Sequence, residues 1–358
     1  MMFNLSGPAP SEARAAIGPA DHWCPSDQQA TFDTRAKAEN LIEVPFLKGT
    51  GLTGQGVNVV IIDQGLNKER LGSEVEGWSV GSIAPGATAI EPGKPHGGHG
   101  MLVAANVLSV APHAKLFDLP MLPRTKIEDV TKFFNDTAND AYRRMLDGIA
   151  AKRKSGKWPG RWILVNAWAI FDTRTDTENY ANNPGHAFNR LVDRAVDEGH
   201  DVVFGAGNCG AFCPDQRCGP LDQGEGRSIV GAASNPKVVT VGAVLSDTTW
   251  TGYSSQGPGQ PAFGEGGKKK PDLCAPSNFL EIADASTANG GTSTPTALTA
   301  GVMAALRSKW GAEVLPTALK SILNATATPV GNGWSPRTGN GILNARRAFE
   351  KLSSQKWP

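Results

Sequence analysis

Residues 57–65 read VNVVIIDQG, and this stretch decides the fold. Its first six residues are apolar in all but one position and mostly β-branched, which suits a strand buried on both faces of a parallel sheet. Asp63 follows at once, so it is expected at the carboxyl end of that strand, where functional groups of such sheets gather. A carboxylate there either orients an imidazole or caps the next segment.

Four further runs of this kind predict the rest of the sheet: Ala114–Leu119, Trp162–Val165, Asp201–Phe204 and Val238–Val241. Between them, Lys126–Lys154 and His186–Glu198 carry apolar residues at steps of three and four, which indicates amphipathic helices. Strands that alternate with helices predict an α/β fold: a doubly wound, mostly parallel sheet with helices on both faces.

The composition limits the classes of partner. With 35 basic and 34 acidic residues the formal net charge is +1, so neither nucleic acid nor a membrane is an expected partner. No stretch approaches the roughly 18 to 20 apolar residues of a membrane helix, and no signal-peptide core precedes the first strand, which predicts a cytoplasmic protein. Residues 1–45 lack sustained periodicity and are interpreted as an N-terminal extension to a domain of residues 46–358.

Three more segments hold residues that can carry chemistry. His96 and His99 lie in KPHGGHGMLVAANVL, where they are metal ligands, buried structural groups, or a catalytic histidine at a glycine-rich helix start. Ser293, in NGGTSTPTALTAG, is either a helix N-cap or a nucleophile beside backbone N–H groups. Asn208 ends VVFGAGN and is either a turn residue or a donor to an oxyanion.

Together these segments resemble the subtilisin-like serine peptidases. VVIIDQG resembles the family's V-A-V-I-D-T-G, HGGHGMLVA its H-G-T-H-V-A-G, FGAGN its A-A-G-N, and GTSTPTALTAG its G-T-S-M-A-T-P-H-V-A-G. The chain order Asp, His, Ser is that of subtilisin. KPDLCAPS and GNGILNARRAF are similar to later family segments, so the resemblance covers about residues 50–350.

The resemblance implies a serine endopeptidase that hydrolyses protein or peptide substrates through an acyl-enzyme, with no cofactor and no metal. It implies a catalytic triad of Asp63, His96 and Ser293, with Asn208 in the oxyanion hole. His99 is interpreted as a structural residue that supports the helix. Nothing in the sequence indicates an oligomeric state.

The implied substrate-binding residues are Gly205, Ala206 and Gly207 beside Asn208, together with Trp168, Ala169 and Ile170. The last three belong to LVNAWAI, which replaces the family's I-N-M-S-L-G-G, and Trp168 narrows the pocket, blocks it or packs beneath it. Pro295 and Leu298 also depart from the family's nucleophile helix. These departures motivate an alternative, a subtilisin-fold binding protein with weak or no activity. A lipase or esterase is disfavoured because no G-x-S-x-G elbow is present and the chain order differs.

Two local differences from the family concern metals and cysteines. AANVLSVAPHAKL continues directly after the histidine helix without carboxylates, so the calcium site of secreted subtilisins is expected to be missing. The insertion CGAFCPDQRCG adds Cys209, Cys213 and Cys218 after Asn208, and their irregular spacing favours a disulfide or reduced cysteines over zinc. The odd total of five cysteines argues against a fully paired secreted framework. Oxidation of this loop is hypothesised to alter the active site.

Overall fold

The computed structural model describes residues 22–23, 33–81, 89–95, 97–281 and 284–357. Within them lies a sheet of nine strands in the order β1-β9-β8-β7-β6-β3-β5-β4, with β10 paired to β8. Its strand pairs are parallel except β8 with β9. The strands are β1 (His22–Trp23), β3 (Val57–Ile62), β4 (Glu76–Gly77), β5 (Lys115–Leu119), β6 (Arg161–Asn166), β7 (Asp201–Gly205), β8 (Val239–Val244), β9 (Trp250–Thr251) and β10 (Leu273–Pro276). A smaller sheet joins β2 (Asp33–Thr34), β11 (Phe279–Glu281) and β12 (Asp284–Asn289).

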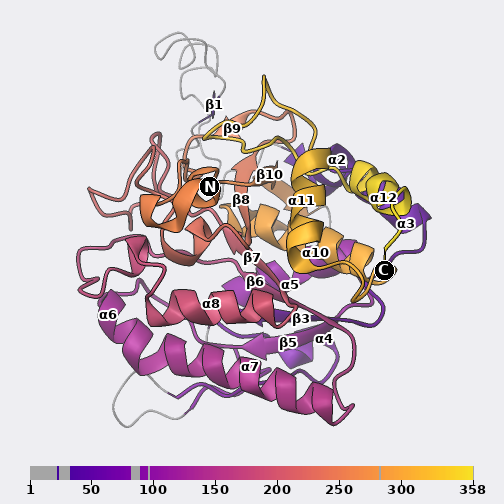
Figure 1. Ribbon diagram of the computed structural model, residues 1–358, viewed down its shortest axis with the longest axis horizontal. Coiled ribbons are helices and arrows are strands. Elements are labelled where there is room, and N and C mark those ends of the chain that lie inside the picture. The colour runs from indigo at the N-terminus through magenta and orange to yellow at the C-terminus, as the bar shows by residue number, and fades with distance from the viewer. Residues whose placement is uncertain (1–21, 24–32, 82–88, 96, 282–283, 358) are drawn as a thin grey trace.

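Alternating side chains of the central strands build two hydrophobic cores, one on each face of the sheet. In β3, Val59 and Ile61 belong to one core, while Val60 and Ile62 belong to the other. The helices divide in the same way, with α7 and α8 along one face and α10, α11 and α12 over the other (Figure 1). The predicted fold class is therefore confirmed, and the period-two alternation explains why these strands read as continuous apolar runs.

The helices are α2 (Arg35–Leu41), α3 (Val44–Gly49), α4 (Lys68–Leu71), α5 (His99–Val110), α6 (Val130–Phe133), α7 (Asn139–Lys154), α8 (Ala187–Asp197), α9 (Gly264–Lys268), α10 (Ser293–Arg307), α11 (Pro316–Thr326) and α12 (Ala345–Ser353). A π-helical turn, η1 (Phe134–Ala138), joins α6 to α7, and short 3-10 turns form η2 (Tyr180–Asn182), η3 (Gly231–Ser234) and η4 (Pro261–Phe263). The first predicted helix starts at Val130 rather than Lys126, because the side chain of Asp129 accepts a hydrogen bond from Lys132 N and caps the helix there.

The described end of the predicted N-terminal extension packs on the main domain. Ala38 and Ile42 are buried in the same core as α5 and α10. Arg35 donates through its two terminal nitrogens to Ser109 and Asn106 of α5, each at 2.9 Å. Among the described helices, none is long and apolar enough to cross a membrane.

Candidate active site

Asp63 lies where the sequence predicts, directly after β3. It is fully buried, its backbone N–H donates to the carbonyl of Leu119 at 3.2 Å, and its Oδ1 accepts from Gln64 N at 2.8 Å. These bonds hold the carboxylate at the carboxyl end of the sheet, pointing to the start of α5.

His99 is the first residue of α5 and joins this carboxylate to a hydroxyl. Its Nδ1 lies 2.8 and 2.9 Å from the two carboxylate oxygens of Asp63, and its Nε2 lies 2.9 Å from Oγ of Ser293. Because a carboxylate only accepts, Nδ1 carries the proton and Nε2 of the neutral ring is free to accept one from Ser293. The close approach requires the next residue to be glycine, since a Cβ at Gly100 would lie 2.5 Å from the carbonyl oxygen of Gly65.

The interpretation of His99 as a structural residue is therefore wrong, and the place that the sequence analysis gave to His96 belongs to His99. His96 itself lies outside the described residues. The physical reason is where the helix begins, since α5 starts at residue 99 and its first side chain faces Asp63. The correct register was readable in the motif: Val103 and Ala104 stand four and five residues after His99, as in the family's H-G-T-H-V-A-G, whereas Gly100 and Met101 stand there after His96.

Ser293 is the first residue of α10, which packs against α5. A Cβ at Gly301 would lie 2.9 Å from the carbonyl oxygen of Val107, so the absence of a side chain lets the two helices come this close. Oγ of Ser293 lies 2.9 Å from Nε2 of His99 and also 2.9 Å from the carbonyl oxygen of Ala167. The hydroxyl has one proton, so it donates to only one of these acceptors at a time.

The imidazole of His99 has a shifted proton affinity. Burial lowers its pKa, but the negative charge of Asp63 and the hydrogen bond to it outweigh burial, so the pKa is raised above the usual 6.5. The positive charge of Arg217 acts in the opposite direction. The ring is therefore a stronger base than a free histidine.

Asn208 follows β7 and is tied to the residue before Ser293. Its Oδ1 accepts from both N and Oγ1 of Thr292, each at 2.9 Å. Since both Thr292 groups donate, the amide orientation is determined, and Nδ2 lies on the opposite side, 3.1 Å from where a Cβ of Gly291 would be. The backbone of Gly291 and Ser293 line the same cleft. An amide that lines the same cleft as Ser293 is the kind of group that can stabilise an oxyanion.

The cleft at Ser293 encloses about 700 Å³. Of the predicted substrate-binding residues, Trp168, Ala169, Ile170 and Gly207 line it, while Gly205 and Ala206 are buried and do not. The ring of Trp168 packs against Phe133, Phe188 and Phe204 in the core beneath the cleft, and its Nε1 donates to Asn166 at 3.2 Å. Of the three interpretations of Trp168, packing beneath the pocket is the one observed.

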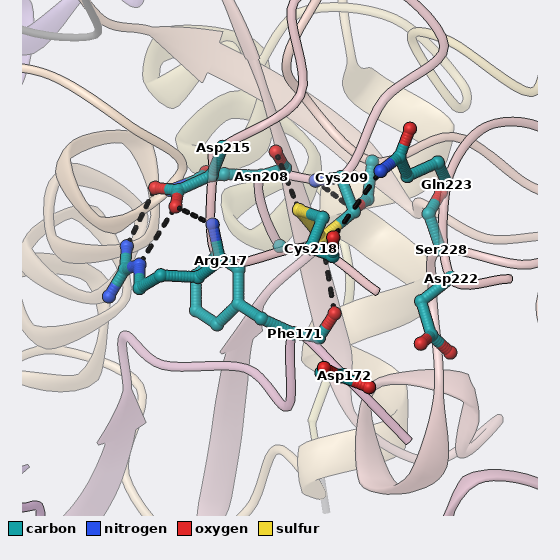
Figure 2. The surroundings of a disulfide bond; sticks show 12 residues. Phe171, Asp172, Asn208, Cys209, Asp215, Arg217, Cys218, Asp222, Gln223 and Ser228 are labelled. Carbon is teal, nitrogen blue, oxygen red and sulfur yellow. Dashed lines mark hydrogen bonds and ion pairs between the residues drawn. A yellow bond between two sulfur atoms is a disulfide. The ribbon is translucent and has the colours of Figure 1, made fainter. Parts of the chain in front are cut away.

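The inserted loop after Asn208 is closed by a disulfide between Cys209 and Cys218 (Figure 2). Cys213 is also disulfide-bonded, whereas Cys274 is a buried free thiol. Two of the three clustered sulfurs are bonded to each other, so the zinc hypothesis is wrong and the disulfide hypothesis is confirmed. Among the residues that the structure describes, no group of three or more His, Cys, Asp or Glu side chains is placed to hold a metal ion. The connection from α5 to β5 is short, since the helix ends at Val110 and the strand begins at Lys115.

Comparisons with known proteins find a family and several relatives. The model of the Subtilase family matches residues 54–341. Subtilisin E of Bacillus subtilis (strain 168) is 27% identical over 323 residues, which cover 86% of this chain and 70% of that protein. Subtilisin of Bacillus pumilus is 26% identical over 323 residues, 86% of this chain and 96% of that protein.

Solved structures show the same fold at lower identity. The serine protease of Aeromonas sobria has a TM-score of 0.64 and 16% identity, and the match covers 93% of this chain and 66% of that one. The prenylagaramide maturation protease PagA has a TM-score of 0.60 and 18% identity, with 87% and 99% covered. At these identities the likeness concerns the fold alone.

Proposed function

This chain belongs to the subtilase family, and we propose from its site that it is a serine endopeptidase whose catalytic triad is Asp63, His99 and Ser293. The family and the subtilisin relatives support a serine peptidase. The observation that carries the finer assignment is the unbroken series of contacts from the Asp63 carboxylate through the imidazole to Oγ of Ser293, on the floor of a cleft.

In the proposed mechanism, Oγ of Ser293 attacks the carbonyl carbon of the scissile peptide bond while Nε2 of His99 accepts its proton. The carboxylate of Asp63 holds Nδ1 and stabilises the imidazolium that forms. His99 then returns the proton to the leaving amine, and the acyl group stays on Ser293. A water molecule that gives a proton to His99 hydrolyses this acyl-enzyme and regenerates the hydroxyl.

The negative oxygen of the tetrahedral intermediate needs donors that are already in place. We assign this role to Nδ2 of Asn208 and the backbone N–H of Ser293, which lies at the N-terminus of α10, where the helix dipole is positive. The fixed orientation of the Asn208 amide supports this role, because reorienting a donor during the reaction would cost free energy.

The alternative of an inactive binding protein rested on Trp168 and on the altered nucleophile helix. Trp168 packs beneath the cleft, and Pro295 lies in the first turn of α10, where proline is tolerated. Leu298, the other departure in this helix, is buried in the core, and the positions of these three residues favour the peptidase over the binding protein. The proposed substrate remains a protein or peptide.

The test is labelling with a fluorophosphonate probe, which forms a covalent bond only with an activated serine. Wild-type protein is expected to label, and Ser293→Ala is expected not to. His99→Ala should lose labelling, while His96→Ala, a matched change three residues earlier, should keep it. Labelling that is lost in His96→Ala and kept in His99→Ala would mean that His96 is the catalytic histidine. A folded wild-type protein that never labels would refute the proposal that this chain is a peptidase.

A further inference from the structure

One wall of the cleft is the loop that the Cys209–Cys218 disulfide closes. The backbone N–H of Asp215 donates to the carbonyl of Asn208 at 2.9 Å, so the loop is bonded to the residue assigned to the oxyanion hole. Gly219 N, just past the disulfide, donates to the carbonyl of Phe171 at 2.7 Å on the facing segment. The disulfide and these bonds connect the wall to Asn208 on one side and to Phe171 on the other (Figure 2).

Arg217 on this wall is held in an unusually defined position. Its Nε and Nη2 donate to the two carboxylate oxygens of Asp215, each at 2.8 Å, and its guanidinium lies 4.0 Å over the ring of Phe171. The edge formed by Nη1 and the second hydrogen of Nη2 is not used by Asp215, and Nη1 has no hydrogen-bond partner in the described part of the chain. Figure 2 shows this nitrogen pointing away from Asp215. The side chain is 44% exposed and lines the cleft.

The charges around the cleft favour a further anion. Its two lining carboxylates are already paired, Asp215 with Arg217 and Asp172 with both Lys126 and Arg174. Hydrogen bonds from Arg174 and Lys126 outweigh burial and hold the pKa of Asp172 far below its usual value. Arg124 also lines the cleft and is exposed. The cleft therefore holds more positive than negative charge.

We propose that Arg217 is a specificity-determining residue that receives the carboxylate of a substrate aspartate or glutamate next to the scissile bond. This inference rests on the proposed peptidase function and names the substrate class of that site. A carboxylate has the spacing to accept two parallel hydrogen bonds from the unused edge of a guanidinium. Because Asp215 and Phe171 already fix the plane of the Arg217 guanidinium, little side-chain entropy is lost when the substrate binds.

The experiment uses peptides that differ only in Glu, Gln or Lys at one position on either side of the cleaved bond. At the contacted position, wild-type protein is expected to show a kcat/KM about tenfold higher for Glu than for Gln, the usual size of a charge-assisted hydrogen-bond pair at a partly exposed site. Arg217→Gln should bring the ratio to about one. Arg217→Lys, which keeps the charge but loses the two-pronged edge, should give an intermediate ratio. Arg190→Gln removes an exposed arginine of α8 outside the cleft and should leave the ratio unchanged.

A binding measurement separates this inference from the proposed function. Fluorescently labelled Glu and Gln peptides are titrated with Ser293→Ala protein, which cannot turn them over. A preference for Glu that Arg217→Gln abolishes supports the inference even where wild-type protein shows no hydrolysis, in which case only the peptidase proposal fails. Equal binding of Glu and Gln peptides at both positions, or a Glu preference that survives Arg217→Gln, overturns the role of Arg217.

Discussion

The buried carboxylate of Asp118 is expected to make the protein less stable as the pH rises towards neutrality. Asp118 lies in β5, is fully buried and interacts with the charge of Asp63. Its Oδ2 accepts hydrogen bonds from the backbone N–H groups of Leu66 and Gly93, each at 2.9 Å. Its Oδ1 is buried and has no hydrogen-bond partner among the residues that the structure describes. Burial, opposed by these two hydrogen bonds and reinforced by the charge of Asp63, raises the pKa of Asp118 from 3.8 to about 7.

The sign follows from linkage between protonation and folding. In the unfolded chain the carboxyl ionises near pH 4, but in the folded chain it stays protonated until near pH 7. Between these two pH values the folded chain keeps a proton on Asp118 that the unfolded chain has released. The free energy of unfolding therefore falls as the pH rises from about 4 to about 7. At 1.36 kcal/mol per pH unit, the loss is at most about 4 kcal/mol and is complete above pH 7.

The perturbation is Asp118→Asn, which keeps an oxygen to accept from Leu66 and Gly93 but cannot ionise. Urea unfolding is measured at several values from pH 4.5 to pH 8, with Ser293→Ala as the background of both proteins to prevent self-digestion. Because every other titrating group is common to the pair, the difference in unfolding free energy isolates Asp118. Over this range the asparagine variant should gain about 3 kcal/mol of stability relative to its parent as the pH rises. A difference that stays constant over this range would refute the reasoning.

Three other predictions concern the site. Asn208→Ala should lower kcat by about 10²- to 10³-fold with little change in KM, because the lost donor acts mainly on the transition state; a parallel rise in KM would indicate a ground-state role. On the acid side of its pH profile, kcat/KM should fall with a midpoint above pH 6.5, because His99 must be neutral to accept a proton and its pKa is raised. Arg217→Gln should move this midpoint to still higher pH, because it removes the positive charge that lowers the pKa of His99. A midpoint that moves down in this variant would contradict the electrostatics. Replacing Cys209 and Cys218 by serine should lower the unfolding free energy by about 2.5 kcal/mol, which is the loop-closure contribution expected for so short a loop. The measurement is urea unfolding in the Ser293→Ala background. An unchanged unfolding free energy would mean that the disulfide does not stabilise the folded protein.

Sequence patterns predicted the sheet well because its central strands are buried on both faces. Side chains on both faces of such a strand are buried, so apolar residues are strongly favoured along its whole length. The strand β3 accordingly has the predicted bounds Val57–Ile62. Helix starts were harder to predict, because they depend on caps and on contacts with distant segments. The start of α5 is such a case, since His99 is selected by the facing Asp63 and not by the flanking glycines alone.

The pairing of Arg217 with Asp215 and Phe171 could not be predicted, because the contact with Phe171 joins segments 46 residues apart across the cleft. The disulfide was one of two open alternatives, since spacing alone does not say whether two thiols meet. Its presence also bears on the predicted cytoplasmic location, which stays a prediction: disulfides are typical of oxidising compartments, so the bond between Cys209 and Cys218 argues against it.

The triad depends on two helices that each begin at a reacting residue. His99 starts α5 and Ser293 starts α10, so the distance between imidazole and hydroxyl is set by how these helices pack. That packing requires Gly301, where any side chain would meet the carbonyl of Val107. A residue outside the cleft thus controls the 2.9 Å contact on which the proposed chemistry rests. The small residues of the α10 segment, which are all buried, therefore serve the proposed catalysis through the approach of α5 as much as through the turn at Ser293.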